Sequence, residues 1–375
     1  MPTKRHAHAA FSLKRRDLLT GSAAVLAIGT LAPAAFAAPD PSLKDFGAAR
    51  GIAFGCAVGA KDLAANPDLA AAIARDCAIV VPENDMKWGA VEQVRGKPDY
   101  QASEAVADFA KRNSMDLRGH TAVWYLNMPA WAKQDITGPQ GRDLILKRVR
   151  DVMGHFRGRV VEWDVINEMI DHTSGRADGM REWPPFAAGD VGFIADCFFA
   201  AKEADPHARL VYNDFGFEYV SAGEDQRRLT ALRLMEQLKT RDAPIDGFGI
   251  QSHLKVGNNF KPQTFRRFLA DIADFGLDIS ITEFDIDDQR LAPEIEARDA
   301  AVAEHARLFL ETAFEEPAVK KLLTWGYSNR NTWLNAHRPR KDGIPHRALP
   351  LDDSMNRTPM WDAIADCLKN APDRR

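Results

Sequence analysis

The sequence predicts an α/β fold of the (β/α)8 TIM-barrel type. Short apolar runs alternate along the chain with longer segments of helical periodicity, a pattern typical of parallel strands joined by helices. Eight such runs are found, and eight is the number of strands that closes this barrel. The runs are residues 52–57, 78–82, 117–123, 160–166, 210–212, 247–250, 279–282 and 322–325.

Amphipathic segments between the runs support the helical half of this prediction. In two of them, apolar residues recur at steps of three and four, which places them on one face of a helix. They are Ile145, Val149, Val152 and Phe156 in one segment and Val302, Ala306, Phe309 and Ala313 in the other. The sequence contains no tandem repeat, low-complexity tract or Ser/Thr/Pro-rich linker, so residues 38–375 are predicted to form a single domain.

The N-terminal residues have the pattern of a targeting signal. Lys14, Arg15 and Arg16 precede a mildly apolar run at 23–35, which ends in the small-x-small sequence Ala-Phe-Ala at 35–37. A basic region, a short apolar region and such a cleavage site indicate a secretory signal peptide over residues 1–37. The paired arginines favour the twin-arginine route and therefore a periplasmic or secreted location. The alternative, a membrane anchor, is disfavoured because the run is short and rich in Ala and Gly.

Composition and charge restrict the partners of the mature chain. The protein is 45% hydrophobic and 27% charged, which is ordinary for a soluble globular domain. Cleavage after Ala37 leaves 44 Lys and Arg against 52 Asp and Glu, a net charge of −8 at pH 7. Nucleic-acid binding requires clustered Lys and Arg, so no nucleic acid is expected as a partner. We expect a monomer that does not associate with a membrane once the signal is removed.

The cysteines give no indication of a metal or redox motif. None of Cys56, Cys77, Cys197 and Cys367 belongs to a C-x-x-C pair, so neither a zinc site nor a thioredoxin-like motif is predicted. Cys56 and Cys77 fall near the first two predicted strands, where an oxidising compartment would permit a disulfide. Buried free thiols are equally compatible with the sequence, and the pairing of the four cysteines is left open.

Two carboxylic acids at the ends of predicted strands carry the functional argument. The segment 160–168 begins as a buried strand and ends in Asn167 and Glu168, and a second apolar strand runs into Glu283 and Asp285. Catalytic groups of these barrels lie at the carboxyl ends of the strands. Two carboxyl groups at one barrel mouth are the minimum that glycoside hydrolysis requires. The pattern predicts a retaining glycosidase with Glu168 as acid/base and Glu283 as nucleophile, their carboxyl groups roughly 5–5.5 Å apart.

These roles require the two glutamates to differ in protonation. His253 is expected to donate a hydrogen bond to Glu283 and keep it ionised. Asp285 lies two residues beyond Glu283, on the same face of an extended segment, and is expected to orient that histidine. Tryptophan surface and the charge of Glu283 are expected to raise the pKa of Glu168. Asn167 is expected to hydrogen-bond a sugar 2-hydroxyl.

Aromatic and polar side chains near the other strand ends are of the kinds that bind sugars. The aromatic candidates are Trp88, Trp124, Trp325 and Trp333, and the polar candidates are Glu83, Asn84, Lys87, His120 and Gln251. Taken singly, each has an ordinary alternative, which is core packing for a tryptophan or for His120 and a solvated charge for Lys87. Their recurrence at the same end of successive strands favours one shared site.

Short motifs recur at or near these strand ends. They are P-E-N-D-M-K-W at 82–88, R-G-K-P-D-Y at 95–100, R-G-H-T-A-V-W at 118–124, W-D-V-I-N-E at 163–168, Y-N-D-F at 212–215, G-I-Q-S-H at 249–253, I-T-E-F-D at 281–285, T-W-G at 324–326 and P-L-D-D at 350–353. These motifs resemble those of the glycoside hydrolase family 10 endo-β-1,4-xylanases, over roughly residues 42–367. The resemblance implies hydrolysis of β-1,4-xylosidic bonds in xylan or xylooligosaccharides, without a cofactor or metal. It assigns the acid/base to Glu168, the nucleophile to Glu283, and their support to Asn167, His253 and Asp285. The positions it implies for substrate binding are Glu83, Asn84, Lys87, His120, Trp124, Asn127, Tyr212, Gln251, Trp325 and Trp333.

Four positions depart from the family pattern. Tyr125 and Asn127 stand where family members usually have His and Gln, Asp85 stands for Glu, and Leu334 stands for Arg. These changes are expected to alter the wall that holds the sugars on the non-reducing side of the cut. Because Asn127 is one methylene shorter than Gln, we expect weaker binding of the second sugar back from the cut, or a preference for a substituted or shorter chain.

Other functions are less consistent with the sequence. A metal-dependent hydrolase would need converging ligands, but residues 38–375 contain no H-x-H or H-x-x-x-H pair. The H-x-H pair His6 and His8 falls within the predicted signal peptide. A phosphate-handling barrel would need a Gly-rich loop late in the chain, and a non-catalytic sugar-binding protein could dispense with one of the carboxylates. A β-1,4-glucanase on the same scaffold is the nearest alternative, since one hydroxymethyl group changes discrimination by only about 1–3 kcal/mol. Endo or exo action and tolerance of xylan side chains are left open.

Overall fold

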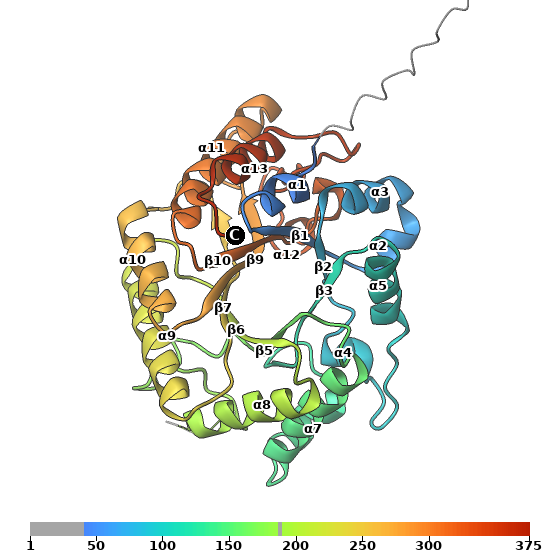
Figure 1. The fold of residues 1–375 in the computed structure, drawn as a ribbon, viewed down its shortest axis with the longest axis vertical. Helices are drawn as coiled ribbons and strands as arrows, with labels where there is room; N and C mark the ends of the chain where they lie inside the picture. Colours follow the sequence, from blue (N-terminus) through green and yellow to red (C-terminus); the bar gives the residue numbers. More distant parts are fainter. Residues whose placement is uncertain (1–40, 187–189) are drawn as a thin grey trace, which may run out of the picture. The chain divides into compact units, whose positions relative to one another are not determined.

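The structure, a computed structural model, describes residues 41–186 and 190–375. The predicted signal peptide lies outside the described residues. Residues Pro41–Arg375 form one compact unit. Eight parallel strands close into a barrel at its centre, as predicted (Figure 1).

The barrel closes because its last strand pairs with two neighbours, β9 and β1, and leaves no free edge. The eight strands are β1 (Ala53–Val58), β2 (Ile79–Pro82), β3 (Asp116–Gly119), β5 (Glu162–Asn167), β6 (Arg209–Asp214), β7 (Gly247–Ile250), β9 (Asp278–Asp287) and β10 (Val319–Thr324). β6 and β10 are longer than their predicted runs, and β9 extends five residues beyond the predicted end at 282. The other five strands are similar to or shorter than predicted.

Helices surround the strands (Figure 1). The helices of the outer ring are α3 (Pro67–Asp76), α5 (Gln101–Arg112), α7 (Gly141–His155), α8 (Val191–Ala204), α9 (Ala222–Thr240), α10 (Pro262–Ala273), α11 (Ile295–Phe314) and α13 (Pro359–Asn370). Shorter helical segments are α1 (Leu43–Ala48), α2 (Ala60–Ala65), α4 (Trp88–Val91), α6 (Ala130–Asp135), η1 (Asn329–Asn331) and α12 (Leu334–His337). Both apolar faces predicted from the sequence, in α7 and α11, are buried.

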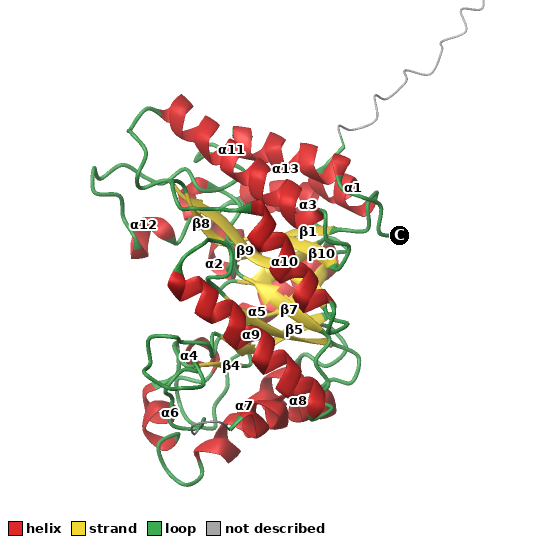
Figure 2. Ribbon diagram, turned by 90° about the vertical axis from the view of Figure 1, so that its left-hand side faces the viewer, coloured by secondary structure: helices red, strands yellow, loops and turns green. Residues whose placement is uncertain are grey.

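Two short strands extend the barrel beyond β3 and β7. The predicted strand 117–123 is divided, because β3 ends at Gly119 and β4 (Val123–Trp124) pairs separately with the end of β5. In the same way, β8 (His253–Lys255) pairs with the end of β9. Figure 2 places β4, β8, α4 and α12 toward one end of the barrel, and α1 and the C-terminus toward the other. The first of these ends is the mouth, where the carboxyl ends of the strands meet.

The barrel interior contains a charged network in addition to apolar side chains. The guanidinium of Arg118 is buried and pairs with both Glu162 and Asp164. Lys321 donates to Glu162 at 2.7 Å and the hydroxyl of Ser280 donates to the same carboxylate at 3.2 Å. Since buried charges are tolerated only when they are paired, these residues act as one unit that joins four strands below the mouth.

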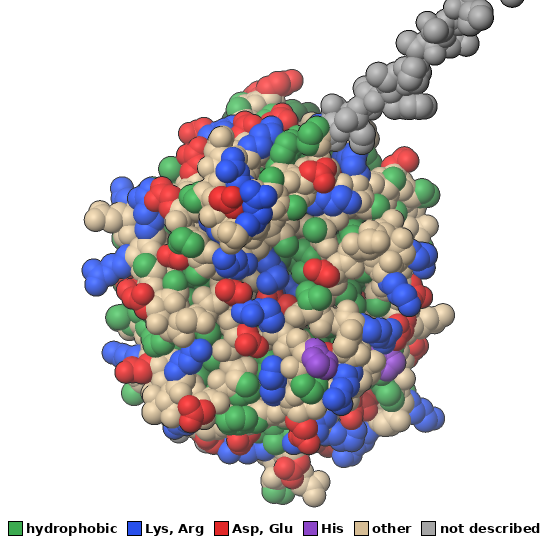
Figure 3. Space-filling view, in the orientation of Figure 1, with side chains coloured by type: hydrophobic (Ala, Val, Ile, Leu, Met, Phe, Trp, Pro, Cys, Tyr) green, Lys and Arg blue, Asp and Glu red, His purple; other side chains and the backbone are tan. Residues whose placement is uncertain are grey.

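The cysteines and the outer surface show no unusual feature. Cys56, Cys77, Cys197 and Cys367 are buried free thiols, and the sulfurs of Cys56 and Cys77 lie 3.7 Å apart. On the face drawn in Figure 3, Lys and Arg side chains are interspersed with Asp and Glu. Among the described residues, no helix has the length and apolar character needed to cross a membrane.

Candidate active site

A cleft of about 910 Å³ lies at the barrel mouth and collects most of the predicted site residues. Of the predicted residues, those that line it are Glu83, Asn84, Lys87, His120, Trp124, Asn127, Asn167, Glu168, Gln251, His253, Glu283, Trp325 and Trp333. They come from segments up to 250 positions apart, which only the closure of the barrel brings together. Asp285 lies behind His253, and Tyr212 lies elsewhere.

The position of Glu168 depends on an unusual backbone conformation. Successive side chains of a regular strand point to opposite faces, yet Asn167 and Glu168 both line the cleft. The φ angle of Glu168 is +61°, in the left-handed region that non-glycine residues seldom adopt. This turn breaks the alternation at the end of β5, so that the amide of Asn167 lies 3.3 Å from the Glu168 carboxylate.

Amide side chains connect the two glutamates across the cleft. Gln251 donates to Oε1 of Glu168 at 2.9 Å. Asn213 donates both to Oδ1 of Asn167 and to Oε1 of Glu283, each at 2.9 Å. The two carboxyl groups therefore belong to one hydrogen-bonded constellation, and the geometry of each depends on neighbours that also hold the other.

Glu283 is held by a second group of residues on its other side. His253 lies with Nε2 3.2 Å from Glu283 and Nδ1 2.9 Å from Asp285. The indole N–H of Trp333 donates to the second oxygen of Asp285 at 2.6 Å. This arrangement of carboxylate, imidazole and carboxylate is the one predicted from the sequence, and it fixes the ring of His253 from both sides.

The surroundings of the two glutamates move their pKa values in opposite directions. Burial raises the pKa of Glu168, and the negative charges of Asp214 and Glu283 act in the same direction. Burial acts on Glu283 too, but the hydrogen bond from His253 and the positive charges nearby outweigh it and lower the pKa. The pKa of His253 itself is raised to about 10, because attraction to Asp285 and Glu283 overcomes the desolvation of the ring. At neutral pH Glu283 and Asp285 therefore face an imidazolium.

Another part of the cleft wall combines a lysine with aromatic rings. The ammonium of Lys87 donates to Asn84 at 2.9 Å and lies 4.8 Å from the ring centre of Trp124 and 5.5 Å from that of Trp325. Burial lowers the pKa of Lys87, although the charges of nearby glutamates, Glu83 among them, act against this. Only 7% of Lys87 is exposed, and its ammonium faces the cleft instead of bulk solvent.

Glu83 and His120 complete this wall. Burial raises the pKa of Glu83 to about 7. His120 lies with Nδ1 2.9 Å from Asp164, so the charged network of the barrel interior fixes the ring. The ring of His120 also contacts Trp325 edge-on, at 5.2 Å between centres. The polar wall of the cleft therefore continues directly into the ion pairs beneath it.

Two aromatic predictions are wrong. Tyr212 is completely buried, its hydroxyl donates to Asp214 at 2.6 Å, and it does not line the cleft. Strand alternation explains the error, because Asn213, the next residue of β6, is the one that faces the barrel interior. Trp88 is also buried, packs edge-on against Trp131 and donates to Glu92 at 3.0 Å, so it is a packing residue.

Of the four departures from the family pattern, Asn127 is the one that lines the cleft. The carboxylate of Asp85 accepts a hydrogen bond from the backbone of Ala60 at the start of α2. The ring of Tyr125 lies under the guanidinium of Arg181, at 3.8 Å. Leu334 is buried against Ala348 and Leu349. Asp85, Tyr125 and Leu334 therefore do not line the cleft directly, and the expectation that they alter the sugar-binding wall stays a prediction.

Sequence reasoning missed a further part of the cleft. The prediction names Tyr212 and omits its neighbour Asn213, although a buried amide at the end of an apolar strand is itself a signal. The remaining lining residues are Leu126, His172, Phe215, Gly216, Glu218, Tyr219, Glu224, Arg227, Lys255, Asn258, His337 and Arg338. Half of them lie in loops after β6, β8 and β10, whose paths the strand pattern does not determine, and Glu224 and Arg227 lie on α9.

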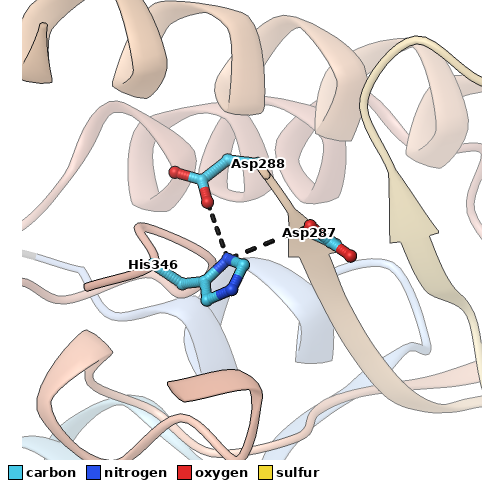
Figure 4. A group of neighbouring side chains, drawn as sticks. All are labelled: Asp287, Asp288 and His346. Carbon is cyan, nitrogen blue, oxygen red and sulfur yellow. Dashed lines mark hydrogen bonds and ion pairs between the residues drawn. The ribbon is translucent and has the colours of Figure 1, made fainter. Parts of the chain in front are cut away.

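A group of possible metal ligands lies outside the cleft lining (Figure 4). Among the described residues, Asp287, Asp288 and His346 place ligand atoms within 4.8 Å of one another. His346 Nδ1 is 2.7 Å from Asp288, but the same carboxylate also pairs with Arg298 at 2.5 Å and Arg340 at 3.5 Å. Two buried guanidinium groups oppose the binding of a cation. The cluster instead joins the end of β9 to the segment that carries His346.

Comparison with known proteins agrees with this geometry. The family description "Glycosyl hydrolase family 10" matches residues 42–367. The chain is 30% identical to endo-1,4-β-xylanase B of Thermotoga neapolitana over 79% of this chain and 82% of that one. It is 29% identical to endo-1,4-β-xylanase 1 of Humicola insolens over 78% of this chain, and the match spans 66% of that enzyme.

A solved structure supports the same assignment. Xylanase 10B of Thermotoga petrophila RKU-1, crystallised in complex with xylobiose, superposes with a TM-score of 0.78 and 28% identity over 88% of this chain and 97% of that one. The sequence match, the barrel and the paired glutamates thus agree with one another. On these grounds the chain belongs to glycosyl hydrolase family 10.

Proposed function

We infer that the protein is a retaining endo-1,4-β-xylanase, which cleaves β-1,4-xylosidic bonds in xylan or xylooligosaccharides by double displacement. The observation that carries this conclusion is the pair Glu168 and Glu283, which share one cleft and one hydrogen-bond network but have opposite pKa shifts. The family match supports the chemistry, and the xylanase relatives support the substrate.

In the first step, the ionised carboxylate of Glu283 attacks the anomeric carbon, and Glu168 gives its proton to the departing glycosidic oxygen. His253 and Asn213 hold Glu283 by hydrogen bonds to different oxygens, so the carboxylate is fixed before the substrate arrives. Such preorganisation lowers the barrier because the attacking group need not be reoriented in the transition state.

In the second step, water attacks the sugar ester formed on Glu283, and Glu168 accepts a proton from that water. Esterification removes the negative charge of Glu283, which is one of the causes that raise the pKa of Glu168. The pKa of Glu168 therefore falls in the intermediate, and the same residue changes from acid to base. Asn167, linked to both groups, is placed to hydrogen-bond the sugar 2-hydroxyl.

The stereochemistry and the substrate can be tested directly. Proton NMR during hydrolysis of xylopentaose is expected to show the β-anomer as the first product, and a 2-fluoro-xylobioside is expected to label Glu283 covalently. Rates on xylan are expected to exceed those on cellooligosaccharides. An α-anomer as first product would contradict the double displacement, and faster cleavage of cellooligosaccharides would contradict the substrate assignment.

We also propose that residues 1–37 direct export by the twin-arginine route and that the mature chain acts as a monomer outside the cytoplasm. The motif around Arg15 and Arg16 supports this proposal. Replacing both arginines by lysine is expected to retain the activity inside the cell. Normal export of that variant would contradict the route, and a mass of twice the mature chain in solution would contradict the monomer.

A further inference from the structure

Three basic side chains at one end of the cleft have no acidic partner. Lys255, on β8, and Arg338, directly after α12, line the cleft, and Arg290 lies beside them. In the part of the chain that the structure describes, none of the three lies within 4.0 Å of a carboxylate. Arg290 uses one nitrogen to donate to Asn258, a lining residue, at 2.9 Å.

Neighbouring basic residues of the same segments are paired. Arg298 and Arg340 both bind Asp288, and Arg347 binds Asp299 at 2.6 Å. Acidic partners are thus available close by, and the protein as a whole carries more acidic than basic residues. Lys255, Arg290 and Arg338 have no such partner, and Arg290 and Arg338 are exposed, so an anion that is not part of the chain can reach them.

The backbone holds two of these residues in fixed positions. His253 and Lys255 are two residues apart on β8, which pairs with β9, so they point to the same side and Lys255 lies one step beyond the residue that holds the nucleophile. The carbonyl of Arg338 accepts a hydrogen bond from Nε2 of His346, whose other nitrogen is bound to Asp288 (Figure 4). The cluster that resembles a metal site thus anchors the loop that presents Arg338.

The carboxylates nearest to Lys255 do not cancel this positive charge. Burial lowers the pKa of Lys255, the positive charges of Arg338 and Arg290 lower it further, and Asp287 and Glu224 act in the opposite direction. The pKa of Glu224 is raised to about 7 by burial and by the charge of a neighbouring glutamate, so this carboxyl is partly neutral near pH 7. Glu224 therefore offsets only part of the positive charge of Lys255, Arg290 and Arg338 near pH 7.

At the centre of the cleft the ionised carboxylate of Glu283 would repel an acidic ligand. A neutral xylose chain is bound by hydrogen bonds to its hydroxyl groups, and its binding does not require a group of unpaired cations. A sugar carboxylate, in contrast, is bound well by guanidinium and ammonium groups, because charge-assisted hydrogen bonds are about twice as strong as neutral ones.

We propose that Lys255, Arg338 and Arg290 bind the carboxylate of a uronic acid side group carried by the xylan chain. This inference rests on the proposed xylanase function and adds a preference to it. Bound there, the side group places the branched backbone in a fixed register relative to Glu283. The enzyme then cuts at a defined distance from each branch, and acidic xylan is a better substrate than neutral xylan of the same length.

The test compares two substrates that differ in charge alone. One is a xylotetraose with a single glucuronic acid branch, and the other is the same compound after reduction of its carboxyl to a primary alcohol. The ratio of kcat/KM for the acidic to the reduced substrate is expected to be roughly tenfold in the wild type. It is expected to fall to about one in the double variant Lys255→Gln, Arg338→Gln, and to fall with added salt.

A matched control is Lys341→Gln, which removes an exposed lysine of the same loop that does not line the cleft. This variant is expected to keep the wild-type ratio. A wild-type ratio near one, or a ratio that the double variant leaves unchanged while both substrates are cleaved, overturns the carboxylate site. Failure of the wild type to cleave either substrate overturns the proposed function itself.

Discussion

The side-chain amide of Asn213 donates a hydrogen bond of 2.9 Å to Oε1 of Glu283. The same nitrogen donates to Asn167, and the carbonyl oxygen of Asn213 accepts from the hydroxyl of Thr282 at 2.7 Å. The hydroxyl thereby fixes which end of the amide faces Glu283. One completely buried side chain therefore orients the nucleophile and the residue next to the acid/base.

Replacing Asn213 by Ala is expected to lower kcat on xylopentaose by about ten- to a hundredfold, the effect of losing a hydrogen bond to a charged group. KM is expected to change much less, since Asn213 does not line the cleft. The variant Thr282→Val, which removes only the group that orients the amide, should have a smaller effect. Equal losses in the two variants would show that general disruption of the site is responsible.

Replacing Glu168 by Ala is expected to lower the rate on xylan by about 10²- to 10⁴-fold, the usual contribution of a general acid. Aryl xylobiosides with acidic leaving groups need little protonation, so their first step should be almost unaffected. Added azide should then restore turnover and yield a β-glycosyl azide. In Glu283→Ala, azide should yield the α-azide instead. Identical leaving-group dependence in Glu168→Ala and the wild type would contradict the assignment.

The pH dependence should follow the opposite shifts of the two glutamates. Because Glu283 must be ionised and its pKa is lowered, the acid limb of kcat/KM should lie below the ordinary range for a glutamate. Because Glu168 must be protonated and its pKa is raised, the alkaline limb should lie above that range. Replacing His253 by Asn removes a hydrogen bond and a positive charge from Glu283, so the acid limb should move to higher pH. An unchanged acid limb would show that His253 does not control the ionisation of Glu283.

Asn127 is the departure from the family pattern that faces the substrate. Its replacement by Gln restores the longer side chain and is expected to raise kcat/KM on short xylooligosaccharides about threefold to tenfold, as one recovered hydrogen bond allows. The variant Leu334→Met, at a buried departure outside the cleft, provides a control that should leave the kinetics nearly unchanged. Unchanged kcat/KM in Asn127→Gln would show that the shorter side chain does not weaken sugar binding.

The charged network inside the barrel should contribute strongly to stability. Replacing Arg118 by Met leaves Glu162 and Asp164 buried without their partner, which is expected to lower the free energy of unfolding by about 3–5 kcal/mol. Replacing Arg266 by Met breaks an exposed ion pair with Glu315 and should cost less than about 1 kcal/mol. Urea unfolding of the two variants measures the difference. A loss below 1 kcal/mol in Arg118→Met would contradict the role of the network.

The fold and the catalytic pair could be predicted because they depend on local pattern. Apolar runs that end in polar residues give both the strands and the edge at which function is located. For Glu168, Glu283, His253 and Asp285, spacing along the chain is sufficient to place each near a strand end. The predicted separation of the two carboxyl groups stays a prediction.

What could not be predicted depends on conformation at single residues and on loop paths. The choice between Tyr212 and Asn213 requires the inward face of β6, which an apolar run that is buried on both sides does not reveal. The left-handed turn at Glu168 has no sequence signal, since glycine is the residue expected there. Lys255 and Arg338 lie near each other only because a loop after β10 approaches the end of β8.

The left-handed backbone of Glu168 implies a trade-off between catalysis and robustness. Non-glycine residues in that conformation cost on the order of 1 kcal/mol, and a buried carboxyl group that must keep its proton adds a further cost. Selection for turnover retains glutamate at position 168, although glycine there would give a larger free energy of unfolding. The most stable form of this barrel is consequently one without catalytic activity.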